Sequence, residues 1–176
     1  LPAGNNRFIA TAANESRLAL SFTGINWLQR TLPLASAWSD SVYGDSKFVI
    51  IASDDDRVLS SADGTTWTQG SIPDDTDGGV DSTTSVWSSI TYGKGKFVAV
   101  SSSDGATASS TDGITWIRHD SAIGFNPNDI SYGNNRFVAV SAVDGQYAYS
   151  FDGITWYTGS VTFTTLATSL GGASFN

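Results

Sequence analysis

The sequence predicts an all-β protein built from four copies of one repeat. Each copy contains a turn with the pattern Ser-x-x-Gly-x-x-Trp, and the four tryptophans are separated by 40, 49 and 40 residues. A second signal is a glycine followed, three residues later, by Arg or Lys and then directly by Phe. It precedes every turn at a constant distance. The four copies of the turn are residues 21–27, 61–67, 110–116 and 150–156. Periods of about forty residues with several short strands each are typical of the blades of a β-propeller.

The third repeat shows the expected order of strands. Residues 89–92 alternate polar and apolar side chains, residues 93–95 form a turn, and residues 96–100 are a β-branched and aromatic run. Asp104-Gly105 is a hairpin signal, and residues after it alternate again. The turn at Asp112-Gly113 then leads into a fourth strand. Because no window shows the apolar period of a helix, each repeat is predicted to form four antiparallel strands.

The ends of the chain bear on how the blades close into a ring. The repeats are predicted to span residues 1–33, 34–73, 82–122 and 123–162 of a single domain, residues 1–176. Repeat one lacks a first strand of its own, whereas residues 163–170 match the start of a repeat. Pairing a C-terminal strand with the N-terminal blade removes two exposed sheet edges. We therefore expect a closed four-bladed propeller in which residues 163–176 complete the first blade; the alternative is a four-blade segment of a larger propeller.

Composition and charge narrow the function classes. A chain of 176 residues with 40% hydrophobic and 12% aromatic residues is long enough to bury the core of one domain. It contains no cysteine, so disulfide and thiol chemistry are excluded. No apolar run reaches the length that crosses a bilayer. The formal net charge of −8 disfavours attraction to phosphate backbones and anionic lipids, so neither nucleic-acid binding nor membrane insertion is expected.

The repeated turn resembles a known motif. It is similar to the Asp-box of sialidases and other secreted propellers, with one residue fewer between Asp and Gly. The pattern Gly-x-x-Lys-Phe-Val-Ala-Val followed by Ser-x-Asp-Gly-x-Thr-Trp resembles more closely the repeats of bacteriophage tail and virion proteins and of exported bacterial proteins. The resemblance implies a propeller fold and leaves the ligand open. Asp63, Asp112 and Asp152 are interpreted as scaffold residues, because an aspartate in such a turn accepts backbone N–H bonds.

The residues needed for catalysis are scarce. A sialidase-like site requires an arginine cluster and a Tyr/Glu pair, whereas the only glutamate is Glu15. The only histidine, His119, has no partner histidine, and nothing resembles the Gly-x-Ser-x-Gly turn of serine hydrolases. A glycoside hydrolase built on two aspartates remains the least favoured alternative. The sequence therefore predicts that the protein is not an enzyme.

One end of the predicted propeller differs strongly between repeats. The loops at this end, and the connections between repeats, vary in length and chemistry, and we call this end the variable face. Because loops on a fixed frame commonly carry function, the ligand site is predicted here. The candidate residues are two tryptophans outside the repeated turn, expected to be exposed and able to stack on sugars, and one aspartate from each of three loops. They are Trp38, Trp87, Asp55, Asp104 and Asp144. The alternative for the tryptophans is packing between blades.

The insertion between repeats two and three contains an acidic segment. Asp75, Asp77 and Asp81 are candidate calcium ligands, although the segment lacks the distal glutamate of an EF-hand loop. The alternative is a solvated acidic loop, and no other cofactor is expected. At the opposite end, each repeat carries one cation in its first turn, a residue expected to form a surface ion pair or to dock an acidic partner. These cations are Arg7, Lys47, Lys96 and Arg136.

Taken together, these features favour a non-catalytic recognition or structural module of a phage virion, a phage tail or an extracellular surface protein. Its expected partner is a cell-surface glycan or protein, together with other subunits or domains of a larger assembly. The main alternative is a free-standing lectin with a repeated sugar pocket. Divergence of the variable-face loops argues against the lectin, because a repeated pocket requires similar loops in several blades.

Overall fold

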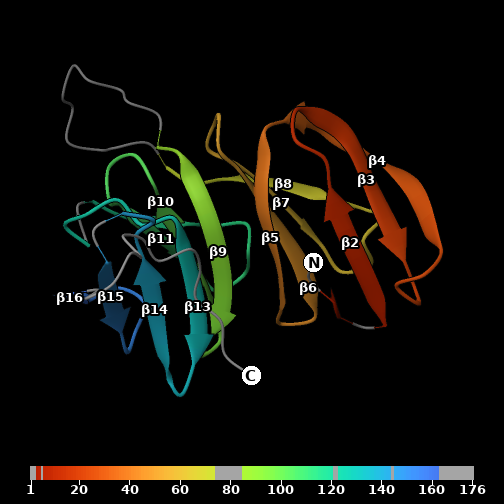
Figure 1. Cartoon of the computed structure of the whole chain (residues 1–176). Helices are drawn as coiled ribbons and strands as arrows, with labels where there is room; N and C mark the ends of the chain where they lie inside the picture. Colours follow the sequence, from red (N-terminus) through yellow and green to blue (C-terminus); the bar gives the residue numbers. More distant parts are fainter. Residues whose placement is uncertain (1–2, 5, 74–84, 121–122, 144, 163–176) are drawn as a thin grey trace.

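The computed structural model confirms the all-β fold with four blades. It describes residues 3–4, 6–73, 85–120, 123–143 and 145–162. These residues form four separate four-stranded antiparallel sheets, and in each sheet the strands lie side by side in chain order (Figure 1). No helix in this part of the chain is long and apolar enough to cross a membrane.

The sixteen strands of the described residues divide evenly among the blades. Blade one comprises β1 (Ala3–Gly4), β2 (Arg7–Thr11), β3 (Glu15–Ser21) and β4 (Trp27–Ser36). Blade two comprises β5 (Trp38–Gly44), β6 (Lys47–Ala52), β7 (Arg57–Ser61) and β8 (Thr68–Ser71). Blade three comprises β9 (Trp87–Gly93), β10 (Lys96–Ser101), β11 (Thr107–Ser110) and β12 (Ile117–His119). Blade four comprises β13 (Asp129–Gly133), β14 (Arg136–Val140), β15 (Gln146–Ser150) and β16 (Tyr157–Ser160).

The two faces of each middle blade pack against different neighbours. Because successive side chains of a strand point to opposite faces, Phe97 and Ala99 of β10 pack on blade two, whereas Val98 and Val100 pack on blade four. Three core clusters result, one between each pair of successive blades. The first strands of successive blades are also linked, since the Ser39 hydroxyl donates to the Trp87 carbonyl at 2.7 Å.

Closure of the ring remains a prediction. The segment expected to complete blade one, residues 163–176, lies outside the described residues. Within the described residues, blade one has only the two-residue strand β1 where blades two and three have seven-residue strands. Among the residues that the structure describes, no core cluster joins blade four to blade one. The two blades lie at opposite ends of the arc in Figure 1.

Candidate functional site

The repeated turn is held together by its own serine and aspartate. In blade three the Ser110 hydroxyl oxygen accepts the Gly113 N–H at 2.8 Å, and Asp112 accepts the N–H groups of Ile114 and Thr115 at 2.8 and 2.7 Å. Blades two and four repeat these bonds around Asp63 and Asp152. The interpretation of these aspartates as scaffold residues is therefore confirmed by their contacts.

The first blade has a weaker version of the same turn. Thr23 replaces the aspartate, and its hydroxyl lies 3.3 and 3.5 Å from the N–H groups of Ile25 and Asn26. A neutral hydroxyl at these distances bonds less strongly than a carboxylate at 2.7–2.8 Å. The Trp27 side chain of this turn is also 37% exposed, whereas its equivalent Trp116 is 4% exposed.

The turn carboxylates predict a dependence of stability on pH. Burial by itself would raise the pKa of Asp112, but hydrogen bonds from the Thr115 and Ile114 backbone outweigh it and lower the pKa to about 2. A carboxyl group whose pKa is lower in the folded state stabilises the fold above its ordinary pKa, here 3.8, and this contribution is lost as the pH falls through the folded-state value.

We expect Asp112→Ala to lower the free energy of unfolding by about 1–3 kcal/mol at neutral pH, because two turn N–H groups lose a charged acceptor. Denaturant unfolding measured from pH 7 downward checks this, and the difference from the parent should shrink below the ordinary aspartate pKa. Thr23→Ala is the matched control and should cost less. Equal losses in the two variants, or a loss independent of pH, would contradict the prediction.

The cations near these turns mainly contact backbone and aromatic groups of the turns. The Lys47 ammonium donates to the Asp112 carbonyl oxygen of the next blade at 3.3 Å and also pairs with Asp45 at 3.1 Å. The Arg7 and Arg136 guanidinium groups lie over Phe22 and Phe151 of their own blades at 5.4 Å from the ring centroids. Lys47, Arg7 and Arg136 thus contribute to the scaffold at this end of the propeller.

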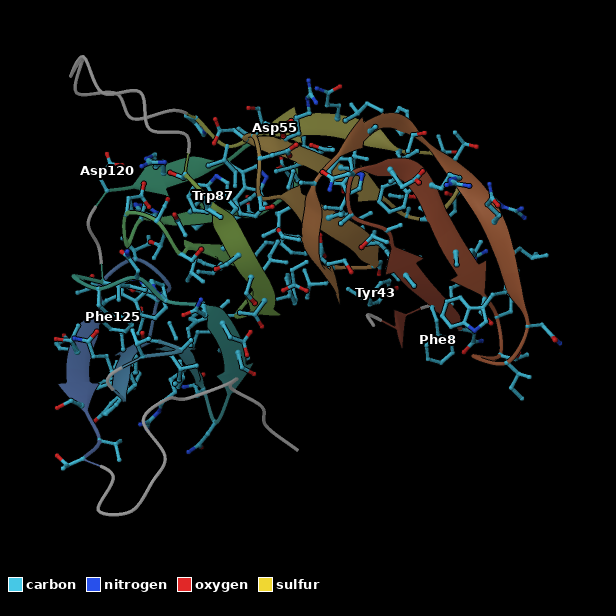
Figure 2. The ribbon with its side chains drawn as sticks, turned by 45° about the horizontal axis from the view of Figure 1, so that its top comes forward. Phe8, Tyr43, Asp55, Trp87, Asp120 and Phe125 are labelled. Atoms are coloured by element: carbon cyan, nitrogen blue, oxygen red, sulfur yellow. The ribbon has the colours of Figure 1, made fainter. Side chains whose placement is uncertain are left out.

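On the variable face, the two tryptophans proposed as sugar platforms are buried. Trp87 is 0% exposed and Trp38 is 4% exposed, so the expectation that they are exposed is wrong. The Trp87 indole, which Figure 2 labels, donates to an Asp56 carboxylate oxygen at 3.1 Å. The Trp38 indole donates to the Glu15 carbonyl oxygen at 3.0 Å. Each indole therefore fastens the start of its blade to the preceding one, which is the packing alternative.

The predicted aspartates of the variable face occupy equivalent positions in successive blades. Glu15 is the first residue of β3, and the equivalent Asp55 and Asp104 lie just before β7 and β11. Each is paired with an arginine: Glu15 with Arg17 at 2.6 Å, Asp55 with Arg57 at 2.8 Å and Asp104 with Arg118 at 2.7 Å. The repeat pattern places Asp144 at the same position of blade four, but this residue lies outside the described residues. Sequence reasoning missed the arginines, although Arg17 and Arg57 follow their carboxylates at the same two-residue spacing.

Arg118 connects the variable-face residues of blade three. Its guanidinium donates to Asp104, Asp120 and the Ser85 hydroxyl, and it lies 5.7 Å from the centroid of the Trp87 ring. Burial would raise the pKa of Asp104, but hydrogen bonds from Ser101, Ser85 and Arg118 lower it below the usual value. The carboxylate is thus held ionised by its neighbours. The side chain of Arg118 is only 8% exposed, whereas that of Asp104 is 26% exposed.

The proposed calcium ligands Asp75, Asp77 and Asp81 lie outside the described residues. Within the described ranges, no group of three or more His, Asp or Glu side chains is placed to hold a metal ion. The calcium hypothesis therefore stays a prediction for that segment.

A polar network joins the first strands of blades two to four. The Ser89 hydroxyl lies 2.9 Å from Asp40 and 2.8 Å from Asp129, and Asp40 also accepts the Ile90 N–H at 2.9 Å. Burial raises the pKa of Asp40, and the nearby Asp129 charge adds to this rise. A hydroxyl carries one proton and can donate to one carboxylate at a time. A proton on Asp40 would satisfy the second contact, which is consistent with its raised pKa.

The only histidine contacts a serine. His119 Nε2 lies 3.0 Å from the Ser109 hydroxyl across the β11–β12 pair. Burial lowers the pKa of His119, and the Lys96 charge lowers it further, which favours the neutral imidazole. A neutral imidazole beside a hydroxyl can accept its proton. Ser109 borders an open pocket of about 360 Å³ that Lys96 also lines.

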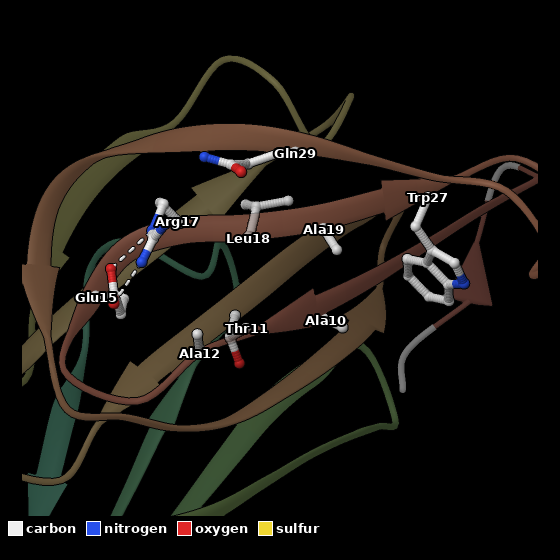
Figure 3. A pocket seen from close by; sticks show the side chains of 9 residues that line it. All are labelled: Ala10, Thr11, Ala12, Glu15, Arg17, Leu18, Ala19, Trp27 and Gln29. Carbon is white, nitrogen blue, oxygen red and sulfur yellow. Dashed lines mark hydrogen bonds and ion pairs between the residues drawn. The ribbon is translucent and has the colours of Figure 1, made fainter.

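An open groove lies on the face of blade one that points away from blade two. It measures about 480 Å³, and Figure 3 shows the small side chains of Ala10, Ala12 and Ala19 between Trp27 at one end and the Glu15–Arg17 pair at the other. The sequence analysis did not predict this groove. The signal was present, because this face carries the alanines that blades three and four bury against the preceding blade, together with a tryptophan whose equivalent in blade three is 4% exposed.

The chain is similar in fold to solved propeller-like structures. A streptogramin B lyase structure aligns with a TM-score of 0.76 at 15% identity, over 98% of this chain and 56% of the lyase chain. A catalytically inactive virginiamycin B lyase from Staphylococcus aureus with quinupristin aligns with a TM-score of 0.74 at 13% identity, over 89% of this chain and 53% of the lyase chain. YCF48 bound to a D1 peptide aligns with a TM-score of 0.61 at 21% identity, over 86% of this chain and 49% of the YCF48 chain. The chain thus spans about half the length of each.

No protein-family model and no curated protein sequence matches the chain. The likeness to solved structures shows the fold alone at these identities, and it supports a β-propeller. It also corrects one expectation. The sequence analysis predicted that the protein is not an enzyme, but the similar structures include lyases, so a propeller of this kind can carry a catalytic site.

Proposed function

We propose that the protein is a recognition module that binds a polypeptide partner through its variable face. The observation that carries this proposal is the recurring carboxylate–arginine pair, which leaves charged and hydrogen-bonding groups partly exposed while Trp38 and Trp87 are buried. In the second blade, Asp55 is 28% and Arg57 is 45% exposed. Such groups suit the amides and charged side chains of a polypeptide. The bound peptide in the YCF48 structure supports the same mode of use of the fold.

The biological setting is part of the proposal. The resemblance of the repeats to phage tail and exported bacterial proteins supports a place in a virion or at an extracellular surface. The partner would then be a host surface protein or another subunit of the assembly. A cell-surface glycan is the second candidate, because Glu15, Asp55 and Asp104 present equivalent acceptors in successive blades and sugar hydroxyls are hydrogen-bond donors.

The test is to screen the protein against a displayed random peptide library and a glycan array. Recovered binders are then measured against Asp55→Asn/Arg57→Gln, which removes one variable-face ion pair at nearly constant size. The matched control is Asp45→Asn/Lys47→Gln, which removes the ion pair at the opposite end. We expect peptides whose affinity falls by about tenfold or more in the first variant alone, a change of about 1.4 kcal/mol.

Three outcomes would oppose the proposal. Binders found only on the glycan array would select the second candidate. Binders that both double variants weaken equally would place the site away from the variable face. The absence of binders in both screens would overturn the recognition function. Repeating the assay with a calcium chelator tests separately whether Asp75, Asp77 and Asp81 contribute a metal-dependent site.

A further inference from the structure

Two pockets occupy equivalent positions at successive interfaces between blades, beside the repeated turns and at the end opposite the variable face. The two–three pocket, between blades two and three, measures about 340 Å³, and the three–four pocket, between blades three and four, measures about 360 Å³. Each is lined by the first-turn cation, two consecutive serines, an aspartate and a threonine of one blade, and by an isoleucine from the turn of the next. These residues are Lys47, Ser60, Ser61, Asp63, Thr66 and Ile114 in the two–three pocket, and Lys96, Ser109, Ser110, Asp112, Thr115 and Ile154 in the three–four pocket.

The polar lining is not a requirement of packing between blades. In blade one, Leu20 occupies the position of Ser60 and Ser109, and it is 1% exposed in the core against blade two. A Cβ on Gly64 in the turn of blade two would lie 3.0 Å from Leu20 Cδ1, so the leucine fills the space beneath that turn. The serines of blades two and three are smaller, and each lines a pocket instead.

The two pockets differ in the surroundings of their cation. In the two–three pocket, the Lys47 ammonium pairs with Asp45 at 3.1 Å. Lys94 stands at the position of Asp45 in blade three, and its own ammonium donates to the Phe151 carbonyl oxygen of blade four at 2.9 Å. Among the residues that the structure describes, the half-buried Lys96 forms no ion pair. Because buried charges are stable when they are paired, this ammonium favours a ligand with a negative charge.

A histidine holds the serine of the three–four pocket. His119 Nε2 lies 3.0 Å from the Ser109 hydroxyl. The equivalent of His119 in blade two is Gly70, where a Cβ would lie 2.5 Å from the Ile114 carbonyl oxygen, so no side chain fits there. A neutral imidazole with its proton on Nε2 donates to Ser109 and leaves the serine O–H free to donate to a ligand. The Lys96 ammonium and the Ser109 hydroxyl thus place two donors in one pocket.

The carboxylate in the lining of the three–four pocket already has its own donors. Asp112 accepts the N–H groups of Ile114 and Thr115 at 2.8 and 2.7 Å, and the Ser110 hydroxyl at 3.0 Å. Asp152 is held by the same kinds of donors in the turn of blade four. These bonds stabilise the negative charge of each turn, so it opposes an anionic ligand less than a carboxylate without donors would.

We propose that the three–four pocket binds an acidic monosaccharide whose carboxylate is held by Lys96 and Ser109. Ligand pockets commonly measure about 300–1,000 Å³, so this one suits a single ring better than a longer chain. Ile154 is 43% exposed and supplies an apolar wall for the C–H face of the ring, and the Thr115 hydroxyl can bond a sugar hydroxyl. The site is separate from the variable face and does not depend on the polypeptide partner proposed above.

Calorimetric titration with glucuronate, glucose and acetate tests the site. We expect one glucuronate per chain, and at least about tenfold weaker binding of glucose, which lacks the carboxylate, and of acetate, which lacks the ring. Lys96→Gln should weaken glucuronate binding by about tenfold or more, a change of about 1.4 kcal/mol, whereas Lys96→Arg keeps the charge and should retain most of the affinity. Lys47→Gln is the matched control in the two–three pocket and should leave the affinity unchanged.

A second pair of variants avoids the cations. Ser109→Ala should weaken glucuronate binding, whereas Ser60→Ala at the equivalent position should not. Circular dichroism confirms that each variant is folded before its affinity is compared. The variable-face variant Asp55→Asn/Arg57→Gln should bind glucuronate like the parent, which keeps this test distinct from that of the polypeptide partner.

Several results would overturn the proposal. They are the absence of glucuronate binding to the parent chain, binding of glucose as tight as that of glucuronate, and equal losses in Lys96→Gln and Lys47→Gln. A carboxylate can also come from an acidic polypeptide, so a blocked tripeptide with a central aspartate is titrated as well. Tighter binding of this tripeptide than of glucuronate, lost in Lys96→Gln, would assign the pocket to a polypeptide and reject the sugar.

Discussion

Trp87→Ala is expected to lower the free energy of unfolding by about 3–5 kcal/mol, the usual cost of removing a fully buried large aromatic side chain. The indole has no exposed surface, belongs to the core between blades two and three, and donates to Asp56 of the preceding blade. Its removal leaves a cavity and removes the hydrogen bond to Asp56 at the same interface. Denaturant unfolding followed by circular dichroism measures the change.

Trp27→Ala provides the matched control. Trp27 belongs to blade one, is 37% exposed and faces the open groove, so its removal creates no enclosed cavity within the chain. Its stability loss should be clearly smaller than that of Trp87→Ala in the same measurement. A small loss for Trp87→Ala together with a loss of ligand binding would return Trp87 to the role of a binding residue.

Gly93→Ala is expected to destabilise the protein by about 3 kcal/mol, near the upper end of the cost of overpacking a core. A Cβ at this position would lie 2.2–2.6 Å from three ring atoms of Tyr132, which packs across from blade four. Gly44 has the same relation to Tyr92 of blade three, because a Cβ at Gly44 would lie 2.1–2.5 Å from three ring atoms of Tyr92. The ring cannot move away without disturbing its contact with Phe137 at a centroid distance of 4.8 Å.

The double variant Gly93→Ala/Tyr132→Ala tests the cause of this loss. If the clash with the ring is responsible, the double variant should lose less stability than the sum of the two single variants, because removal of the ring relieves the overlap. Gly95→Ala is a second control. Its Cβ would meet nothing within 4 Å, so it should show only the strain of a φ of +75° in a residue with a side chain. Additive losses in the double variant would rule out the clash.

Much of the fold could be predicted from the sequence because its signals are local. A turn such as 110–116 satisfies its own N–H groups with Ser110 and Asp112, so the residues that define it in the sequence also hold it in the structure. The alternation in residues 96–100 divides the strand into two sets that point to opposite faces. The number of blades and the antiparallel order of strands follow from four repetitions of these signals.

The candidate site depended on tertiary packing to a greater degree. The pattern placed Trp38 and Trp87 at the start of a first strand but contained no information on whether another blade covered them. The pairing of Asp104 with Arg118 joins the β10–β11 loop to β12, 14 residues further along the chain, whereas the equivalent carboxylates of blades one and two pair with an arginine two residues away. The sequence alone does not show that the Asp104 carboxylate is already paired with Arg118.

The sequence by itself determined that this is a repeat protein of antiparallel blades, because each repeat carries the hydrogen-bonding groups and the alternation that form one sheet. Only the tertiary structure decided which faces of those sheets are covered. Ala10 and Ala99 are equivalent in sequence, but Ala99 is fully buried under blade two, whereas Ala10 lines an open groove. Gly93 reads as a turn residue, yet a tyrosine of the next blade excludes any side chain from it. Burial depends on the neighbouring blade, and alternation along one strand does not specify that neighbour.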